Sequence, residues 1–329
     1  MAMRITSIDF FRFLFMLQVC LWHLNHCMGV MEHGYVAVEF FFILSGYFLY
    51  KSCVKKNALG VFEYSWDKIK RFYPEVLIVT IPATIVYFAG LGPNPIALFN
   101  SIFFLQNIGI FSGGGVNLPL WYINVLLLGG GIIYAVLYNY RRLAITIVFP
   151  LLVLMVYTYI LNENKGSFEW FAIKLSFYIP LWRGMAGLCL GCLLARFHEI
   201  KLSKPILKVT RLLDVLLLMS IVGSLVCVFA AHHLDCYALL FYSIIILSCF
   251  TRGTLVNKLF SHSIWNYLGQ LSFEMLLVHM PIAWVLGKIY SVWNFPAVVL
   301  LMLYILLTLI SSMLLKYINK NLLRITFMR

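Results

Sequence analysis

The chain has 329 residues, of which 63% are hydrophobic and only 11% are charged, and its mean hydropathy is +0.93. This composition excludes a soluble globular domain and indicates a polytopic membrane protein. The net charge of +13 does not point to nucleic acid, because the basic residues lie in short loops between apolar runs, where the positive-inside rule accounts for them. We therefore expect membrane lipids around the chain and no nucleic-acid partner.

Ten apolar windows are long enough to cross a hydrocarbon core of about 30 Å. They lie near residues 8–28, 35–52, 72–90, 119–138, 143–161, 175–195, 212–231, 236–251, 265–287 and 296–316. Of the 25 Lys and Arg residues, 21 fall on the side of the N-terminus and three on the opposite side. This asymmetry predicts that both termini are cytoplasmic. The sequence thus predicts one all-α, multi-pass transmembrane domain over residues 1–329.

The first window carries Arg12 and His23 and has no small-residue cleavage site, so we expect an uncleaved first span. The two residues stand eleven positions apart, which is about three helical turns and roughly 16 Å along one helix face. Ionisable groups at such depth usually line a cavity, a pathway or a reaction site. The alternative is a histidine bonded to a backbone carbonyl and an arginine snorkelling to the headgroups. Asp9, one turn before Arg12, can pair with it.

Glu39 in the second window lies close to the predicted depth of His23, because a short outer hairpin joins the two spans. A carboxylate there could orient the imidazole and raise its basicity, as general-base catalysis requires. A simple ion pair that anchors the hairpin is the alternative. On the opposite side, Lys68 and Arg71 cluster with Arg12 and would suit a phosphate-bearing cytosolic ligand. On this motif alone, ordinary positive-inside charge is the simpler explanation.

Arg183, inside the sixth window, needs a counter-ion, and Glu274 of the ninth window is a candidate. Glycines 184, 187 and 191 beside it would let helices approach closely. His279 follows Glu274 by five residues. Trp121 and Asn124 offer an aromatic face and an amide that suit a sugar, although packing also explains the tryptophan. We place all five residues as candidate substrate contacts.

Three further features are the connection at residues 91–118, the cysteines and a loose histidine cluster. The uncharged connection at residues 91–118 is too apolar for a solvated loop, so it either folds back as a candidate lid or lies as an interfacial helix. The eight cysteines form no CxxC pair and are expected to be buried thiols, with a Cys27–Cys236 disulfide as an alternative. No metal is expected, because the loose cluster of His23, His26, Glu32 and His33 fits no ligand template.

Several motifs in this order resemble the integral-membrane acyltransferase-3 family, which transfers acyl groups onto glycans, lipids and small molecules. The resemblance rests on Asp9, Arg12 and His23, the FFILSG block at residues 41–46, Lys68 with Arg71 and Pro74, Leu120–Trp121, and Ser272 with His279, Met280 and Pro281. It implies that Arg12 and His23 form the functional pair and that Lys68 and Arg71 bind the acyl donor.

The chain departs from the usual family pattern in three places. Glu39 replaces an aspartate, Lys68 stands where arginine is common, and Tyr122 and Leu126 replace a serine and a glutamate after the tryptophan. A lysine lacks the bidentate fork with which arginine holds phosphate. The changes after Trp121 imply a subgroup with a different acceptor mouth.

We expect an O-acyltransferase, in the class that transfers acyl groups other than aminoacyl groups, and most simply an O-acetyltransferase. It would use acetyl-CoA or another cytosolic acyl-CoA and modify a hydroxyl of an extracytoplasmic or lipid-linked polysaccharide at a bacterial inner membrane. His23, Glu39 and Arg12 would be catalytic, with His23 acting as a general base or as an acyl carrier. The rival interpretation is an exporter of a glycan or lipid-linked sugar, since intramembrane charges also mark transport pathways.

Overall fold

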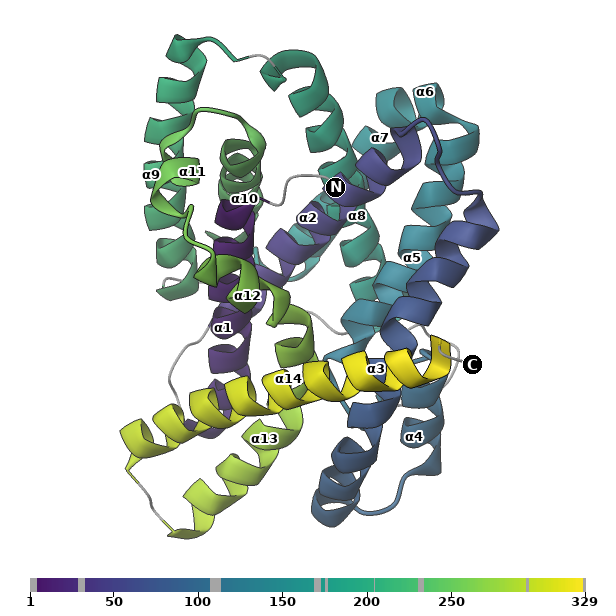
Figure 1. The fold of residues 1–329 in the computed structure, drawn as a ribbon, viewed down its shortest axis with the longest axis vertical. Coiled ribbons are helices and arrows are strands. Elements are labelled where there is room, and N and C mark those ends of the chain that lie inside the picture. Colours follow the sequence, from purple (N-terminus) through teal and green to yellow (C-terminus); the bar gives the residue numbers. More distant parts are fainter. Residues whose placement is uncertain are drawn as a thin grey trace.

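The computed structural model describes residues 5–28, 33–106, 114–168, 173–174, 177–203, 205–229, 234–293 and 296–327 (Figure 1). Its long helices are α1 (Thr6–Met28), α2 (Ala37–Val54), α3 (Val61–Leu91), α5 (Leu120–Asn139), α7 (Phe149–Glu163), α8 (Ile179–Phe197), α9 (Leu207–Phe229), α10 (Asp235–Phe250), α13 (Ser272–Trp293) and α14 (Ala297–Phe327).

Short elements join these helices. They are η1 (Gly34–Val36), α4 (Pro95–Ile102), α6 (Arg141–Leu143), η2 (Ala144–Val148), η3 (His198–Leu202), α11 (Leu255–Leu259) and α12 (Ile264–Gln270). Two two-residue strands, β1 (Ile173–Lys174) and β2 (Phe177–Tyr178), pair antiparallel immediately before α8. The prediction of an all-α membrane protein is therefore confirmed, apart from this one small ladder.

Within the described part of the chain, eight helical segments are long and apolar enough to cross a membrane. They correspond to eight of the ten predicted windows. The windows at 175–195 and 236–251 also form helices, α8 and α10, but α10 has only 16 residues. Ten crossings with cytoplasmic termini therefore remain a prediction.

Helix α2 lies at the centre of the fold, because its sequence is apolar on every face and buried along most of its length. Its closest partner is α8. A Cβ added at Gly46 would lie 2.0 Å from the carbonyl oxygen of Leu188, and one added at Gly191 would lie 2.0 Å from the carbonyl oxygen of Ile43. These two glycines bring the helix backbones into direct contact, as small residues do between membrane helices.

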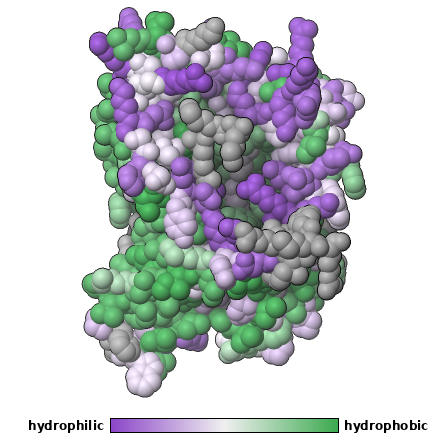
Figure 2. All heavy atoms as spheres, in the orientation of Figure 1, coloured by the Kyte–Doolittle hydropathy of each residue, from purple (hydrophilic) through white to green (hydrophobic). Residues whose placement is uncertain are grey.

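The outer helices α3, α7, α9 and α14 bury only one stripe and expose large apolar side chains to the surroundings, among them Ile81, Leu154, Met219 and Met302. Exposing such an apolar surface to water would be unfavourable, but lipid tails are as apolar as these side chains. Figure 2 shows hydrophilic side chains gathered over the upper part of the molecule and mainly hydrophobic ones over the lower part. The face seen in this view therefore has a polar end at the top and a mainly apolar lower part.

The described residues of the connection between α3 and α5 show features of both predicted alternatives, because α4 and the residue after it expose Ile96, Phe99 and Phe103 while polar side chains turn into the protein. Asn100, Gln106 and Asn117 are all buried. Asn117 Nδ2 donates to the carbonyl oxygen of Leu277 in α13 at 2.8 Å. That carbonyl lacks its usual helical partner because Pro281, four residues on, has no N–H. Asn117 thus attaches the connection to α13 through the Leu277 carbonyl, which Pro281 leaves without a helical donor.

The seven cysteines whose side chains the structure describes are free thiols, five of them buried. Cys27 lies outside the described side chains, so the alternative of a bond to Cys236 is not tested. The side chains of His26 and Glu32 lie outside them as well.

Candidate active site

A cavity of about 610 Å³ lies between α1, α2, α3, α5, α8 and α13. Residues as far apart on α2 as Val38 and Lys51 line it, which gives it a length of about 20 Å along that helix. Six of the candidate residues named from the sequence line this one space: Arg12, His23, Lys68, Arg71, Trp121 and Arg183. The structure thus brings these six residues, which come from four separate helices, to one cavity.

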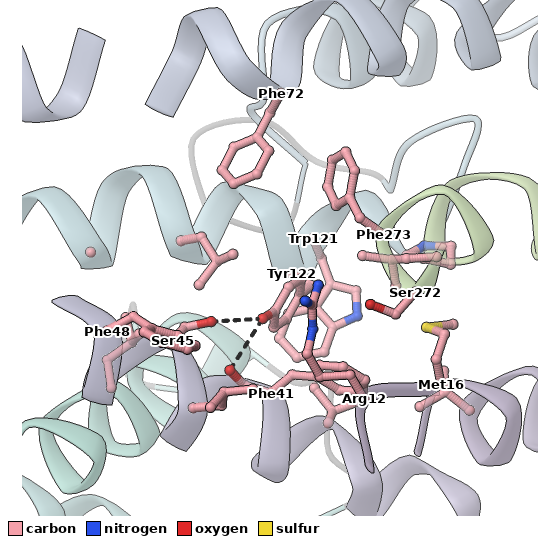
Figure 3. A pocket seen from close by; sticks show the side chains of 18 of the residues that line it. Arg12, Met16, Phe41, Ser45, Phe48, Phe72, Trp121, Tyr122, Ser272 and Phe273 are labelled. Atoms are coloured by element: carbon pink, nitrogen blue, oxygen red, sulfur yellow. Dashed lines mark hydrogen bonds between the residues drawn. The ribbon is translucent and has the colours of Figure 1, made fainter. Parts of the chain in front are cut away.

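Arg12 enters the cavity from α1. Its Nη1 lies 3.1 Å from Asp9 Oδ1, the predicted pair, and Asp9 is buried while Arg12 is partly exposed. In Figure 3 the guanidinium points toward the middle of the cavity, where Trp121, Tyr122 and Ser272 are drawn. The Tyr122 hydroxyl contacts Ser45 Oγ at 3.1 Å and donates to the Phe41 carbonyl at 3.3 Å. This residue, which departs from the family pattern, therefore forms part of the wall.

One end of the cavity is basic. Lys68 and Arg71 line it from α3, and Lys51 lines it from the last turn of α2. Lys68 Nζ lies 5.2 Å from the centre of the Tyr64 ring, and Lys51 Nζ lies 5.9 Å from that of Tyr47, so aromatic faces hold both ammonium groups. From the sequence, Lys51 was only one of the charges that the positive-inside rule explains. Its position two turns after Leu44, on the cavity face of α2, was the signal that could have identified it.

His23 is held from two sides. Its Nδ1 lies 3.0 Å from the carbonyl oxygen of Val19 and 3.3 Å from Nε2 of His279 on α13. Trp22 packs against the ring edge-on at 4.4 Å. The histidine thus bonds a backbone carbonyl, as the structural alternative supposed, and lines the cavity as well. His279 is fully buried behind it and does not line the cavity, so its predicted contact with substrate is not supported.

The predicted contact of Glu39 with His23 is wrong. Glu39 Oε1 accepts from Arg183 Nε, and its Oε2 accepts from the Tyr157 hydroxyl at 2.5 Å. Both members of the ion pair are at most 1% exposed. The carboxylate lies on the side of α2 that packs against α8, so it bonds to that helix and to α7. Glu39 does form an ion pair, as the alternative supposed, but its partner is Arg183, which the sequence did not indicate.

Arg183 consequently has Glu39 as its counter-ion, and the proposed pairing with Glu274 is wrong. A second nitrogen of Arg183, Nη1, donates to the Phe168 carbonyl at 2.7 Å. The third, Nη2, makes no hydrogen bond within the described part of the protein. Arg183 also lines the cavity. A guanidinium whose other two nitrogens are fixed in this way can offer the remaining N–H groups to a bound oxygen atom.

Two other predicted substrate contacts lie outside the cavity lining. Asn124 Nδ2 donates to the Gln106 carbonyl at 2.6 Å, so the amide anchors the connection between α3 and α5. Glu274 is buried beside α14, where its Oε1 lies 3.9 Å from Lys316 Nζ. In each case the helix is turned so that the polar group meets another helix or loop, a rotation that sequence spacing alone does not fix.

A polar cluster that sequence reasoning missed lies beside the cavity, near the start of α2. Tyr35 lines the cavity, and its hydroxyl donates to Asp235 Oδ2 at 2.7 Å and contacts Ser167 Oγ at 3.0 Å. The same Asp235 oxygen accepts from the backbone N–H of Phe168 at 2.8 Å. Residues from η1, the α7–α8 connection and α10 thus meet beside the Arg183 site.

At the polar end, η3 carries a second network. The Tyr47 hydroxyl lies 2.9 Å from His198 Nδ1, and Tyr50 donates to Glu199 Oε2 at 2.7 Å. Burial lowers the pKa of His198, and the nearby charge of Lys51 acts in the same direction. Burial alone would raise the pKa of Glu199, but hydrogen bonds from Tyr50 and Arg196 outweigh it and lower that pKa. The network ties η3 to the same helix that carries Lys51.

The whole-chain comparison agrees with these features. The family model described as "Acyltransferase domain" matches residues 5–317, so the chain belongs to this acyltransferase family. The protein is accordingly a multi-pass membrane acyltransferase. The curated proteins and the solved structures gave no match. The comparisons lend the transporter alternative no support.

Proposed function

We propose that the protein is a membrane O-acyltransferase that moves an acyl group, most simply acetyl, from cytosolic acyl-CoA to a hydroxyl of an extracytoplasmic or lipid-linked polysaccharide. The observation that supports this proposal is the single cavity that joins the basic end of Lys51, Lys68 and Arg71 to His23. A nucleotide-phosphate donor with a long thioester arm has the matching chemistry, with anionic groups at one end and the reactive carbonyl at the other.

In this proposal Lys68, Arg71 and Arg12 bind the donor's phosphates, and Lys51 joins them as a further cation. The thioester arm then extends along α1 toward His23. The cavity would keep water from the thioester, which would otherwise be hydrolysed. The host membrane in the simplest case is the inner membrane of a bacterium.

His23 has two possible roles in the transfer. As a general base, it removes the proton of the acceptor hydroxyl while the oxygen attacks the thioester carbonyl, and it then returns that proton to the departing thiolate of CoA. As an acyl carrier, its nitrogen attacks the thioester first, CoA leaves as the thiol, and the acceptor hydroxyl takes the acyl group in a second step. The first route gives ternary-complex kinetics, and the second gives ping-pong kinetics with a trappable acyl-histidine.

Arg183 is the proposed donor to the oxygen atom that becomes negative in the tetrahedral intermediate. Its Nη2 is buried, and the Glu39 and Phe168 contacts fix the plane of the guanidinium. A donor fixed before the reaction stabilises developing charge without reorganisation. Trp121, in the same cavity, is the proposed aromatic face for the sugar acceptor.

The test is the ester content of surface glycans, measured by mass spectrometry in a null strain that carries wild type, His23→Ala or His262→Ala at matched protein level. His262 is an exposed histidine outside the cavity and serves as the matched control. Loss of an ester from otherwise normal glycan in the null and His23→Ala strains, with recovery by His262→Ala, would support the proposal. Loss of the glycan itself from the surface, with its precursor accumulating inside, would contradict it in favour of export.

A further inference from the structure

The imidazole of His279 lies directly behind that of His23, on the side away from the cavity lining. The two ring centres are 4.8 Å apart, and His279 Nε2 lies 3.3 Å from His23 Nδ1. His279 is fully buried, whereas His23 lines the cavity. The two histidines come from α1 and α13 and are 256 residues apart in sequence. Their contact therefore depends on how these two helices pack.

The hydrogen bonds fix where the protons of this pair lie. His279 Nδ1 is 2.9 Å from the Met275 carbonyl, and His23 Nδ1 is 3.0 Å from the Val19 carbonyl. A carbonyl oxygen only accepts, so each Nδ1 must carry a hydrogen. In neutral His279 the lone pair then lies on Nε2, where it faces the N–H of His23. That N–H is shared between the Val19 oxygen and His279 Nε2.

A cationic His279 does not fit this arrangement. Its second N–H, on Nε2, would point at the N–H of His23 with no acceptor between them. The side chain is also fully buried, in a stretch of α13 where Leu277, Val278 and Met280 are buried as well. Burying an isolated charge there would cost much more than keeping the ring neutral.

We infer that His279 is a positioning residue that, together with the Val19 carbonyl, holds His23 in the tautomer with hydrogen on Nδ1. The lone pair of His23 then lies on Nε2, and this atom takes the acceptor proton or the acyl group. The inference rests on the proposed function of His23 and adds to it the identity of the reacting nitrogen. The arrangement works like other catalytic imidazoles, in which an acceptor bonded to one nitrogen decides the chemistry of the other.

The backbone around His279 is built to hold it in place. Pro281 removes the helical hydrogen bond of Leu277, and Asn117 takes up the open carbonyl from outside the helix. His279 lies between these two positions on α13. The contact of α13 with the connection that carries Asn117 thus holds the helical turn on which His279 lies.

The test compares His279→Phe, which keeps a ring but has no acceptor, with His279→Gln, whose amide oxygen can accept from His23. Full-length protein in isolated membranes is given radiolabelled acetyl-CoA, and label in the membrane glycan fraction gives kcat and the KM for acetyl-CoA. We expect His279→Phe to lower kcat by about 10²-fold, the lower end of the contribution of general-base catalysis, because the Val19 carbonyl still accepts from Nδ1 in this variant. The KM for acetyl-CoA should stay within about threefold, and His279→Gln should recover at least about tenfold of the lost kcat.

A merely structural role would not give this split between kcat and KM, nor the rescue by glutamine. A His279→Phe variant with unchanged kcat, or a His279→Gln variant as impaired as His279→Phe, would overturn the inference. In a His23→Ala background, which gives a readout independent of the glutamine rescue, His279→Phe should cause no further loss, because its effect passes through His23. A further loss equal to that in the wild-type background would also overturn it.

The same assay separates this inference from the proposed function. If the wild type transfers no acetyl group, or if His23→Ala is as active as the wild type, the proposed function or its site is wrong. If His23→Ala is inactive and His279→Phe has wild-type kcat, only the role of His279 is wrong.

Discussion

Replacement of Glu39 by glutamine tests the role that the fold gives this carboxylate. Glutamine has nearly the same shape, so the change removes a charge without leaving a cavity. Arg183, 1% exposed, would then be a buried cation without its counter-ion. Breaking a buried ion pair in this way costs about 3–5 kcal/mol. We expect the free energy of unfolding to fall by that amount in Glu39→Gln, and similarly in Arg183→Met.

The double variant Glu39→Gln with Arg183→Met carries no buried charge at this place. Its loss should be smaller than the sum of the two single losses by about 2–3 kcal/mol, the upper range of measured couplings between contacting residues. Tyr157 and the Phe168 carbonyl lose charged partners in it, so part of the cost remains. The assay is detergent-induced unfolding of the purified protein followed by tryptophan fluorescence.

Glu63→Gln is the matched control, because Glu63 is exposed near the start of α3 and should change stability by less than about 1 kcal/mol. One result would refute the reasoning. That result is a free energy of unfolding for Glu39→Gln within about 1 kcal/mol of the wild type, together with loss of acyl transfer. The carboxylate would then act in the chemistry rather than in holding α2, α7 and α8 together.

Three further predictions concern Lys51 at the basic end of the cavity, Asn117 in the connection between α3 and α5, and His198 in η3. Lys51→Gln should raise the KM for acetyl-CoA about 5–30-fold, as expected for loss of one charge-assisted contact, but leave the KM for S-acetylpantetheine unchanged, with exposed Lys56→Gln as control. Equal effects on both donors would contradict a phosphate contact. Asn117→Ala should cost about 1–3 kcal/mol of stability by leaving a buried carbonyl without its donor, and adding Pro281→Ala should restore part of it; no recovery would contradict that account. The pKa of His198 is lowered in the fold, so near and below about pH 6.5 the unfolded chain binds more protons, and the stability of the fold decreases as the pH is lowered. Between pH 7.5 and pH 5.5 the melting temperature of His198→Asn should therefore decrease less than that of the wild type. Parallel decreases in the two proteins would exclude His198 as the cause.

Much of the fold follows from the sequence because the bilayer imposes simple rules. Runs of apolar residues must form helices, since lipid offers no partner to an open backbone. The spacing of Arg12 and His23 on one helix face is likewise local, so sequence alone brought both to the same side. Lys68 and Arg71 could be placed near Arg12 because they come directly before the third predicted span, on the predicted cytoplasmic side.

Only the tertiary structure decided which polar groups meet between helices. Glu39 could have faced His23 or Arg183, and the choice depends on the rotation of α2, which is fixed by the close approach to α8 at Gly46 and Gly191. The pairing of His23 with His279 joins helices at opposite ends of the chain. Hydropathy and spacing determine that a helix crosses and which of its residues share a face. They carry no information on which distant helix that face will meet, because that is settled by packing over the whole molecule.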